Sequence, residues 1–275
     1  FLAARPMSVG LLMGILLPLI IPAYGVQSPF VLLTYSMIGG ISFLRIMDEM
    51  LDKSKIKEVV YWVVILFILT QVFSRLNVAL PLYRLYVLLA SLVILYLIWS
   101  WLRQSSEAVE GFISRLLLLI GAGFFSLTAL FQLTGKADMA NYLYESAIYS
   151  LAITSVFGLF IHIMRGLLAW LLNLPPIWNI KLLRSEMTRL IHGFSVLLQF
   201  IFLVFVLMPL YLKIWGVFDT QAEATKQFIL LGFNLGSARI DIQLMVTIFV
   251  ILYSSHMLSW LIPRVFLDEV FMVNY

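Results

Sequence analysis

The sequence contains no cysteine and few charged residues. The lack of cysteine excludes disulfides, thiol nucleophiles and thiolate metal sites together. Only 12% of the 275 residues are charged, whereas a soluble domain carries about twice that share. Hydrophobic residues make up 63% of the chain, so its composition indicates a membrane protein. The formal net charge of +4 is too small to indicate nucleic-acid binding.

Motifs of enzymatic chemistry are also missing from the sequence. It has no phosphate-binding G-x-x-x-x-G-K-[ST], no dinucleotide-binding G-x-G-x-x-G after a strand and no nucleophile motif G-x-S-x-G. The three histidines, His162, His192 and His256, lie on three different predicted helices without the spacing of a metal site. We expect them to form hydrogen bonds between helices. The sequence predicts no catalytic residue, no cofactor and no metal, and we expect that the protein is not an enzyme.

What the sequence does have is a series of long apolar runs separated by short polar clusters. A helix that crosses the ~30 Å hydrocarbon layer of a bilayer needs roughly 20 apolar residues. The runs do not alternate between apolar and polar residues as the strands of a transmembrane barrel do. We therefore predict an all-α, polytopic transmembrane fold with about eight membrane helices. Their expected ranges are 6–24, 29–47, 59–74, 81–103, 109–133, 138–172, 190–215 and 242–263.

The polar stretch between the last two predicted membrane helices has signals of its own. Thr220 and Glu223 form a T-x-x-E capping box, and the following turns mix apolar with polar residues. This pattern predicts a short amphipathic helix at the membrane interface. Gly232 lies where we expect that helix to stop. Asp241 is expected to cap the eighth membrane helix, and Arg239 to pair with it.

Several segments resemble one family of membrane channels. The opening FLAARPMSVGLLMGILLPLI joins an Arg-Pro step to an apolar helix and a proline-containing turn, and the next helix ends with Arg45. The middle segment TGKADMANYLYESAIYSLAITSVFGLFIHIMRGLLAWLL leads from a small loop into a long helix. The tail joins IWGVF, a polar interfacial segment and LLGFNLGSARIDIQLMVTIFVILYSSHMLSWLIPRVFL. In this order the segments resemble the large, MscK/MscM-like branch of the MscS superfamily of mechanosensitive channels.

The resemblance implies an architecture and a function. Residues 1–185 would form six peripheral transmembrane helices, and residues 186–275 a paddle-like helix pair that precedes a pore helix beyond Tyr275. The chain would be the sensor of a tension-gated channel that releases solutes on hypo-osmotic shock, as a multi-pass subunit in the bacterial inner membrane. Its partners would be membrane lipids and further copies of itself in a homoheptamer. Ions would permeate through a pore that this sequence does not contain.

Tension sensing requires groups whose contacts with lipid differ between the closed and open states. We expect bulky apolar side chains of the last two helices to contact acyl chains, and nearby aromatic and cationic side chains to contact the headgroup region. Ordinary lipid-facing side chains and snorkelling cations would show the same pattern, so this alternative stays open. The candidate residues are Phe202, Phe205, Lys213, Trp215, Lys226, Arg239 and Phe249.

Helix breakers and small residues form a second group of candidates. Pro209, Gly232 and Gly236 are candidate hinges, although a kink, a helix stop and a turn explain them equally well. Close helix packing is the expected role of four further glycines in G-x-x-x-G and G-A-G patterns. These are Gly10, Gly14, Gly121 and Gly123.

Two ionisable residues of the sixth predicted helix, Glu145 and Arg165, are also candidates. Ionisable groups at membrane depth are functional candidates by default. Glu145 lies soon after the start of the helix, and Arg165 follows its apolar core. We therefore favour the interpretation that both side chains reach the membrane interface.

The direction of insertion and the class of function each have an alternative. The positive-inside rule places both ends of the chain in the cytoplasm. The resemblance places Tyr275 outside, because the pore helix that follows must run inward. A secondary transporter or lipid-handling permease is the alternative function, with a midplane site at the breaks Gly39, Gly40 and Pro209. A membrane scaffold without transport activity is a third.

Overall fold

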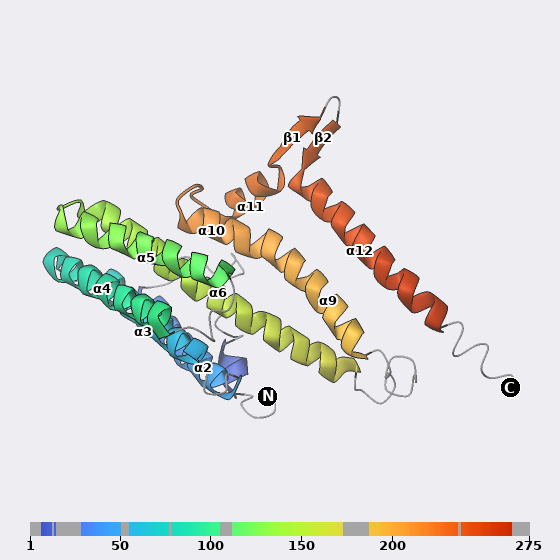
Figure 1. Cartoon of the computed structure of the whole chain (residues 1–275), viewed down its shortest axis with the longest axis horizontal. Coiled ribbons are helices and arrows are strands. Elements are labelled where there is room, and N and C mark those ends of the chain that lie inside the picture. Colours follow the sequence, from blue (N-terminus) through green and yellow to red (C-terminus); the bar gives the residue numbers. More distant parts are fainter. Residues whose placement is uncertain are drawn as a thin grey trace. The chain divides into compact units, whose positions relative to one another are not determined.

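The computed structural model is a set of α-helices with one short β-hairpin (Figure 1). It describes residues 7–12, 14, 29–50, 55–76, 79–104, 112–172, 187–235 and 238–265. The long helices of the first part are α2 (Pro29–Met50), α3 (Lys55–Arg75), α4 (Leu80–Gln104), α5 (Phe112–Leu133) and α6 (Ala137–Leu172). Then follow α9 (Met187–Phe202), the π-helix η1 (Leu203–Leu207), α10 (Met208–Ile214), α11 (Gln221–Ile229), β1 (Gly232–Leu235), β2 (Ala238–Asp241) and α12 (Ile242–Val265). The all-α class is confirmed, and the hairpin is an addition that the sequence did not predict.

Six of the described helical stretches are long and apolar enough to cross a membrane, which makes the chain a multi-pass membrane protein. They correspond to the third to eighth helices expected from the sequence. The second expected helix, 29–47, is present as α2. Most of the first, 6–24, lies outside the described residues. The six spans are Lys57–Arg75, Leu80–Arg103, Arg115–Leu133, Ala137–Leu171, Arg189–Ile214 and Ile242–Trp260.

The chain divides into two compact units, Phe1–Ser155 (unit 1) and Val156–Tyr275 (unit 2). The boundary falls inside α6, so this helix of 36 residues contributes its first half to unit 1 and its second half to unit 2. The sequence instead suggested a functional boundary at residue 185, after α6. Compactness and function are different criteria, so the two boundaries need not coincide.

In unit 1, α2 packs closely against α3 at Gly40. A Cβ atom built at Gly40 would lie 2.7 Å from Cδ1 of Ile68, so any larger residue would force that side chain to move. At the end of the same helix pair, Asp48 forms an ion pair with Lys57 and accepts a hydrogen bond of 3.3 Å from the hydroxyl of Tyr61. The sequence suggested Gly40 only as a helix break, whereas the structure shows it as a contact point between two continuous helices.

The core of unit 1 is formed by α3, α4, α5 and the first half of α6. Each of these helices contributes buried side chains to one cluster. Apolar faces of neighbouring helices meet in this way because burial between helices also shields their few polar groups from lipid. The buried members are Leu66, Tyr83, Val87, Ala90, Ile94, Phe125, Tyr144 and Ile148.

In unit 2, the buried Pro209 lies directly after the π-helical turn η1. A proline lacks an N–H group, and in a regular α-helix its ring collides with the carbonyl four residues earlier. Here the N–H of Met208 bonds to the carbonyl of Leu203, five residues earlier, which widens the turn in front of the proline ring. The irregularity that the sequence predicts at Pro209 is therefore a π-helical turn.

A two-stranded antiparallel hairpin connects α11 to α12, with Gly232 opposite Asp241. A Cβ at Gly232 would lie 2.3 Å from the carbonyl oxygen of Ile240 and 2.6 Å from Cα of Asp241. The expectation that Gly232 stops α11 is wrong, because the helix is already capped at Leu230, whose φ is −82°. Glycine is needed here because the opposite strand approaches too closely for a side chain. Gly236 lies outside the described residues.

Candidate functional site

A network of buried hydroxyl groups joins α3, α4 and α6 within unit 1. The hydroxyl of Tyr86 lies 2.9 Å from that of Thr70 and 3.0 Å from that of Tyr144. Thr70 and Tyr144 have no exposed surface. The ring of Phe73 stacks on that of Tyr86, with centroids 4.6 Å apart. Hydrogen bonds between these hydroxyl groups thus join three helices at one point.

The same end of unit 1 holds a carboxylate. The hydroxyl of Tyr83, on α4, donates a hydrogen bond to Oε1 of Glu145, on α6. A second contact joins Phe67 of α3 to Tyr149 of α6, whose ring centroids lie 6.0 Å apart. The expectation that Glu145 reaches the membrane interface stays a prediction, and its hydrogen bond to a neighbouring helix was not expected. Within the described part of the chain no group of acidic and histidine side chains could hold a metal ion.

An open apolar groove of about 460 Å³ lies between α3 and α4, beside the hydroxyl network. Its wall is formed by large side chains such as Trp62, Leu69 and Leu85, and by the outer face of Tyr86. The groove has almost no polar lining. Hydrocarbon is the medium that suits such a surface in a membrane helix pair.

In unit 2, α12 is the most exposed of the six membrane spans. Only 6% of its span is buried, compared with 33% for the span in α3. Leu252 is 65% exposed and Ile251 is 57% exposed. Figure 1 shows α12 leaving the hairpin as a single long helix. Most of its surface is therefore available to lipid or to other chains.

The helices α11 and α12 each begin at a capping residue, and a side-chain hydrogen bond joins the hairpin between them to the end of α11. Thr220 accepts a hydrogen bond of 3.2 Å from the N–H of Glu223, which confirms the predicted cap of α11. Asp241 accepts a hydrogen bond of 2.8 Å from the N–H of Leu244, which confirms the predicted cap of α12. Arg239 was expected to pair with Asp241, but its Nη2 donates to the carbonyl of Leu230, the C-cap of α11.

Two phenylalanines proposed as lipid contacts pack largely against protein within unit 2. The ring of Phe202 stacks on that of Phe160 of α6, with centroids 4.4 Å apart. The ring of Phe249 on α12 lies 4.0 Å from that of Phe200 on α9, centroid to centroid. Phe205 belongs to η1 and is half-buried. These rings link α6, α9 and α12, and contact with acyl chains stays a prediction for their exposed edges.

The cations proposed as phosphate contacts lie near the hairpin end of unit 2. Lys213, in the last turn of α10, and Lys226, in the last turn of α11, are both exposed. Arg239 is exposed as well, although one of its donors is used within the protein. Trp215 is half-buried, directly after α10. Their contact with lipid stays a prediction.

The glycines proposed for helix packing divide into two groups. A Cβ at Gly121 would lie 3.7 Å from Cδ1 of Ile98, so α5 meets α4 there in ordinary contact. A Cβ at Gly10, Gly14 or Gly123 would meet nothing within 4 Å among the described residues. Their role in close packing stays a prediction.

One close glycine contact in unit 2 was missed by the sequence patterns. A Cβ at Gly193 of α9 would lie 2.9 Å from Cε of Met257 on α12. No local sequence pattern around Gly193 predicts this contact, because its partner lies 64 residues later in the chain. Only the pairing of α9 with α12 makes this glycine a contact point.

A polar contact joins the second half of α6 to α9. Nε of Arg165 donates a hydrogen bond of 2.7 Å to Oγ of Ser195, and Nε2 of Gln199 donates one of 2.9 Å to the same oxygen. Ser195 is buried and Arg165 is half-buried. The expectation that Arg165 reaches the interface stays a prediction, and one edge of its guanidinium is bonded to the neighbouring helix.

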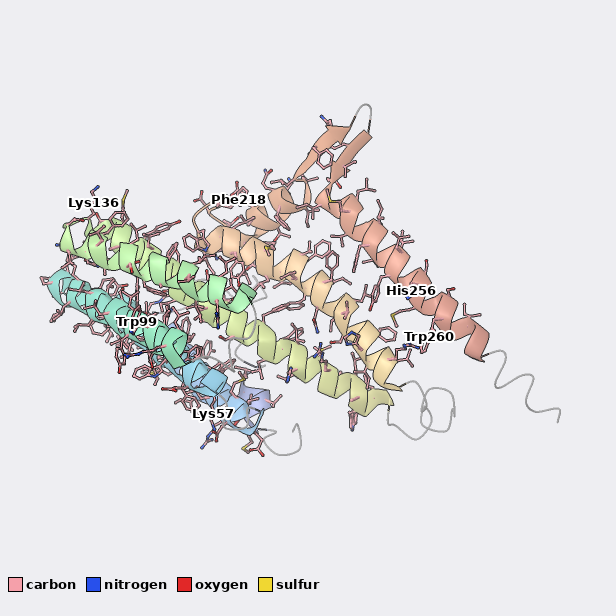
Figure 2. The ribbon with its side chains drawn as sticks, in the orientation of Figure 1. Lys57, Trp99, Lys136, Phe218, His256 and Trp260 are labelled. Atoms are coloured by element: carbon pink, nitrogen blue, oxygen red, sulfur yellow. The ribbon has the colours of Figure 1, made fainter. Side chains whose placement is uncertain are left out.

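A cationic side chain also contacts α12. The guanidinium of Arg189, at the start of α9, lies over the ring of Trp260 at 4.9 Å from the centroid. Figure 2 shows Trp260 and His256 on the final part of α12. The hydrogen bonds between helices expected of His162, His192 and His256 are not found among the described residues, and all three side chains are exposed. The helices of unit 2 are held instead by the arginines and the aromatic rings.

Comparison of the chain with protein-family models, curated proteins and solved structures finds no match.

Proposed function

We propose that this chain is the membrane-tension sensor of a mechanosensitive channel of the MscS superfamily, in its large MscK/MscM-like branch. The observation that carries the proposal is the exposure of α12, of whose span only 6% is buried. A helix with so few protein neighbours takes its tilt mainly from the surrounding lipid. Stretching the bilayer changes that lipid environment, and a difference in lipid contact between two states is what shifts an equilibrium.

The attachments of α12 support the same proposal. At its start, Asp241 caps the helix and the hairpin joins it to α11. Toward its other end, Met257 packs on Gly193 of α9, and Trp260 lies under Arg189. Between these attachments the exposed residues include the large apolar side chains Ile248, Ile251 and Leu252. A helix that contacts protein at a few points and is otherwise exposed to lipid can convert a change in membrane thickness into a change of tilt.

The order of the elements is the second support. A membrane helix interrupted near a proline, a short amphipathic helix, a turn and a further membrane helix follow one another in the order that the resemblance implies. We propose that a pore helix follows this pair, that seven copies of the chain surround the pore, and that the protein resides in the bacterial inner membrane. Solutes and ions would leave through that pore after hypo-osmotic shock.

Patch-clamp recording of the full-length protein tests the proposal. The protein is expressed in bacterial spheroplasts that lack their own mechanosensitive channels, and suction is applied to excised patches. We expect discrete channel openings below the tension that ruptures the membrane. Replacing the exposed Leu252 of α12 by Asn is expected to raise the tension of half-maximal opening, because a polar amide weakens the contact of α12 with hydrocarbon.

Leu89→Asn is the matched control. Leu89 is 53% exposed on α4, in unit 1. We expect this variant to open at the same tension as the unaltered protein, because the same polar group is placed outside the proposed sensor. A protein that reaches the membrane but shows no opening at any tension up to rupture would contradict the proposal. So would equal effects of the two variants.

A further inference from the structure

We infer that the second half of α6 and the start of α9 form a binding site for the phosphate of an anionic phospholipid, with Arg165 at its centre. This site is separate from the cations near the hairpin, and it does not depend on the proposed channel function. The inference rests on the hydrogen bonds of Arg165, on the charge of its surroundings and on its position near the ends of two membrane helices.

The first step concerns the hydrogen bonds of Arg165. A guanidinium carries several N–H donors and one full positive charge. Its Nε bonds to Oγ of Ser195, which also accepts a bond from Gln199. A neutral hydroxyl satisfies one donor but does not neutralise the charge. The terminal amino groups, which suit a planar anion with two oxygens, have no hydrogen bond to the described residues.

The second step concerns the charge of the surroundings. The described stretches 156–172, 187–202 and 242–262 of unit 2 contain no Asp or Glu. They do contain Arg165 and Arg189, as well as all three histidines of the chain. The guanidinium of Arg189 lies over the ring of Trp260. A half-buried cation in a membrane helix is costly unless an anion comes close to it.

The third step concerns depth. Arg165 lies seven residues before the end of α6 at Leu172, which corresponds to about 10 Å along the helix. Ser195 lies eight residues after the start of α9 at Met187, or about 12 Å. A long arginine side chain at this depth reaches the level of lipid phosphates by snorkelling. Basic sites between membrane helices recognise anionic headgroups for this reason.

The geometry also explains why Arg rather than Lys stands at residue 165. Ser195 holds the Nε edge and thereby orients the plane of the guanidinium. The opposite edge, which makes no hydrogen bond within the described part of the chain, can make two parallel hydrogen bonds to phosphate oxygens. An ammonium group supplies the same charge but cannot be oriented by Ser195 while also presenting two donors in a plane.

Lipid retention measured by native mass spectrometry tests the site. The full-length protein is delipidated in detergent and exposed to mixed micelles of phosphatidylglycerol and phosphatidylcholine, which differ in net charge. We expect the protein to retain phosphatidylglycerol preferentially. Arg165→Gln is expected to reduce that retention roughly fivefold, the effect of removing one basic residue next to an anionic lipid surface. Arg165→Lys is expected to retain an intermediate amount.

Arg84→Gln is the matched control, because Arg84 is an exposed arginine of unit 1 that lies on α4. It is expected to leave retention at this site unchanged. A buffer containing inorganic phosphate separates the two sources of the anion. Displacement of the lipid by phosphate would show that a free anion is the ligand and would overturn the lipid assignment, whereas retention of the lipid supports it.

Two further results would overturn the inference. One is equal retention of phosphatidylglycerol and phosphatidylcholine by the unaltered protein, a measurement that holds even if Arg165→Gln does not fold. The other is retention of phosphatidylglycerol by Arg165→Gln equal to that of the unaltered protein, which would show that Arg165 does not hold the lipid. Loss of lipid selectivity in Arg165→Gln in a protein that shows no tension-gated current would support the lipid site and contradict only the channel proposal.

Discussion

The hydroxyl of Tyr83 on α4 donates a hydrogen bond to the carboxylate of Glu145 on α6. The two residues are 62 positions apart in the sequence, and their bond lies beside the buried hydroxyl network around Tyr86. Tyr83 is only 9% exposed. Because the Tyr83 hydroxyl is largely buried, its bond to Glu145 is expected to matter for the stability of unit 1.

Removing this hydroxyl is the first prediction. Tyr83→Phe keeps the ring but leaves the carboxylate of Glu145 without its donor. We expect the free energy of unfolding to fall by about 1–3 kcal/mol, the usual cost of losing the partner of a buried polar group. The measurement is an unfolding titration of the purified protein in mixed micelles.

Tyr96→Phe is the control, because Tyr96 lies on the same helix and is 70% exposed. It is expected to change the free energy of unfolding by much less. In the double variant Tyr83→Phe with Glu145→Gln, the loss of unfolding free energy should be smaller than the sum of the two single losses, because both substitutions remove the same interaction. Strict additivity would show that the bond contributes nothing to stability.

The second prediction concerns the hairpin between α11 and α12. In Gly232→Ala, the new Cβ would collide with backbone atoms of Ile240 and Asp241, which cannot turn aside as a side chain can. We expect the strand pair to separate at this end and the local stability to fall by about 1–3 kcal/mol. Hydrogen exchange of the amides in 231–242 should become faster.

Gly123→Ala is expected to raise the local stability, the opposite of the effect of Gly232→Ala. A Cβ at Gly123 meets nothing within 4 Å, and alanine stabilises a helix relative to glycine by up to about 1 kcal/mol. Slower or equal exchange in α5 would fit this expectation. Unchanged exchange of the hairpin amides in Gly232→Ala would contradict the close approach of β1 to β2.

The third prediction concerns the π-helical turn before Pro209. Pro209→Ala removes the ring and restores an N–H that can bond to the carbonyl of Phe205, so a regular α-helix becomes available. We expect η1 to convert to α-helix, which would rotate α10 relative to α9 by about 100°, the rotation of one residue. Spin labels at the exposed positions Phe194 and Lys213 would report the change as a shift in their separation.

Leu210→Ala, measured with the same pair of labels, serves as the comparison, because it alters the neighbouring residue and retains the proline. It should leave the separation of the labels as in the unaltered protein. If Pro209→Ala also left the separation of the labels as in the unaltered protein, packing around η1 rather than the proline would maintain the wide turn.

Much of the helical framework follows from the order of residues alone. The apolar runs predicted α3, α4, α5, α6 and α12 because the length of a membrane helix is set by the bilayer and is visible locally in the chain. The caps at Thr220 and Asp241 could be predicted for the same reason, since a cap and the helix it begins lie within a few residues of each other.

The lateral contacts could not be predicted from these patterns. The hairpin after α11 was missed because its strands have four residues each and carry no long alternation. The hydrogen bonds of Glu145 with Tyr83 and of Arg165 with Ser195 were missed because these partners lie on other helices. Phe202 was expected to face lipid, although it stacks on Phe160.

By itself, then, the sequence determined that this is a multi-pass helical membrane protein and where most of its helices begin and end, because hydrophobicity and capping act between residues close together in the chain. Tertiary structure alone decided which helix face meets another helix, which polar groups find partners and which apolar faces are left to lipid. Those outcomes depend on contacts between residues tens of positions apart, such as Tyr83 with Glu145 and Gly193 with Met257. In an almost uniformly apolar chain, no local pattern distinguishes a face that packs on protein from one that packs on hydrocarbon.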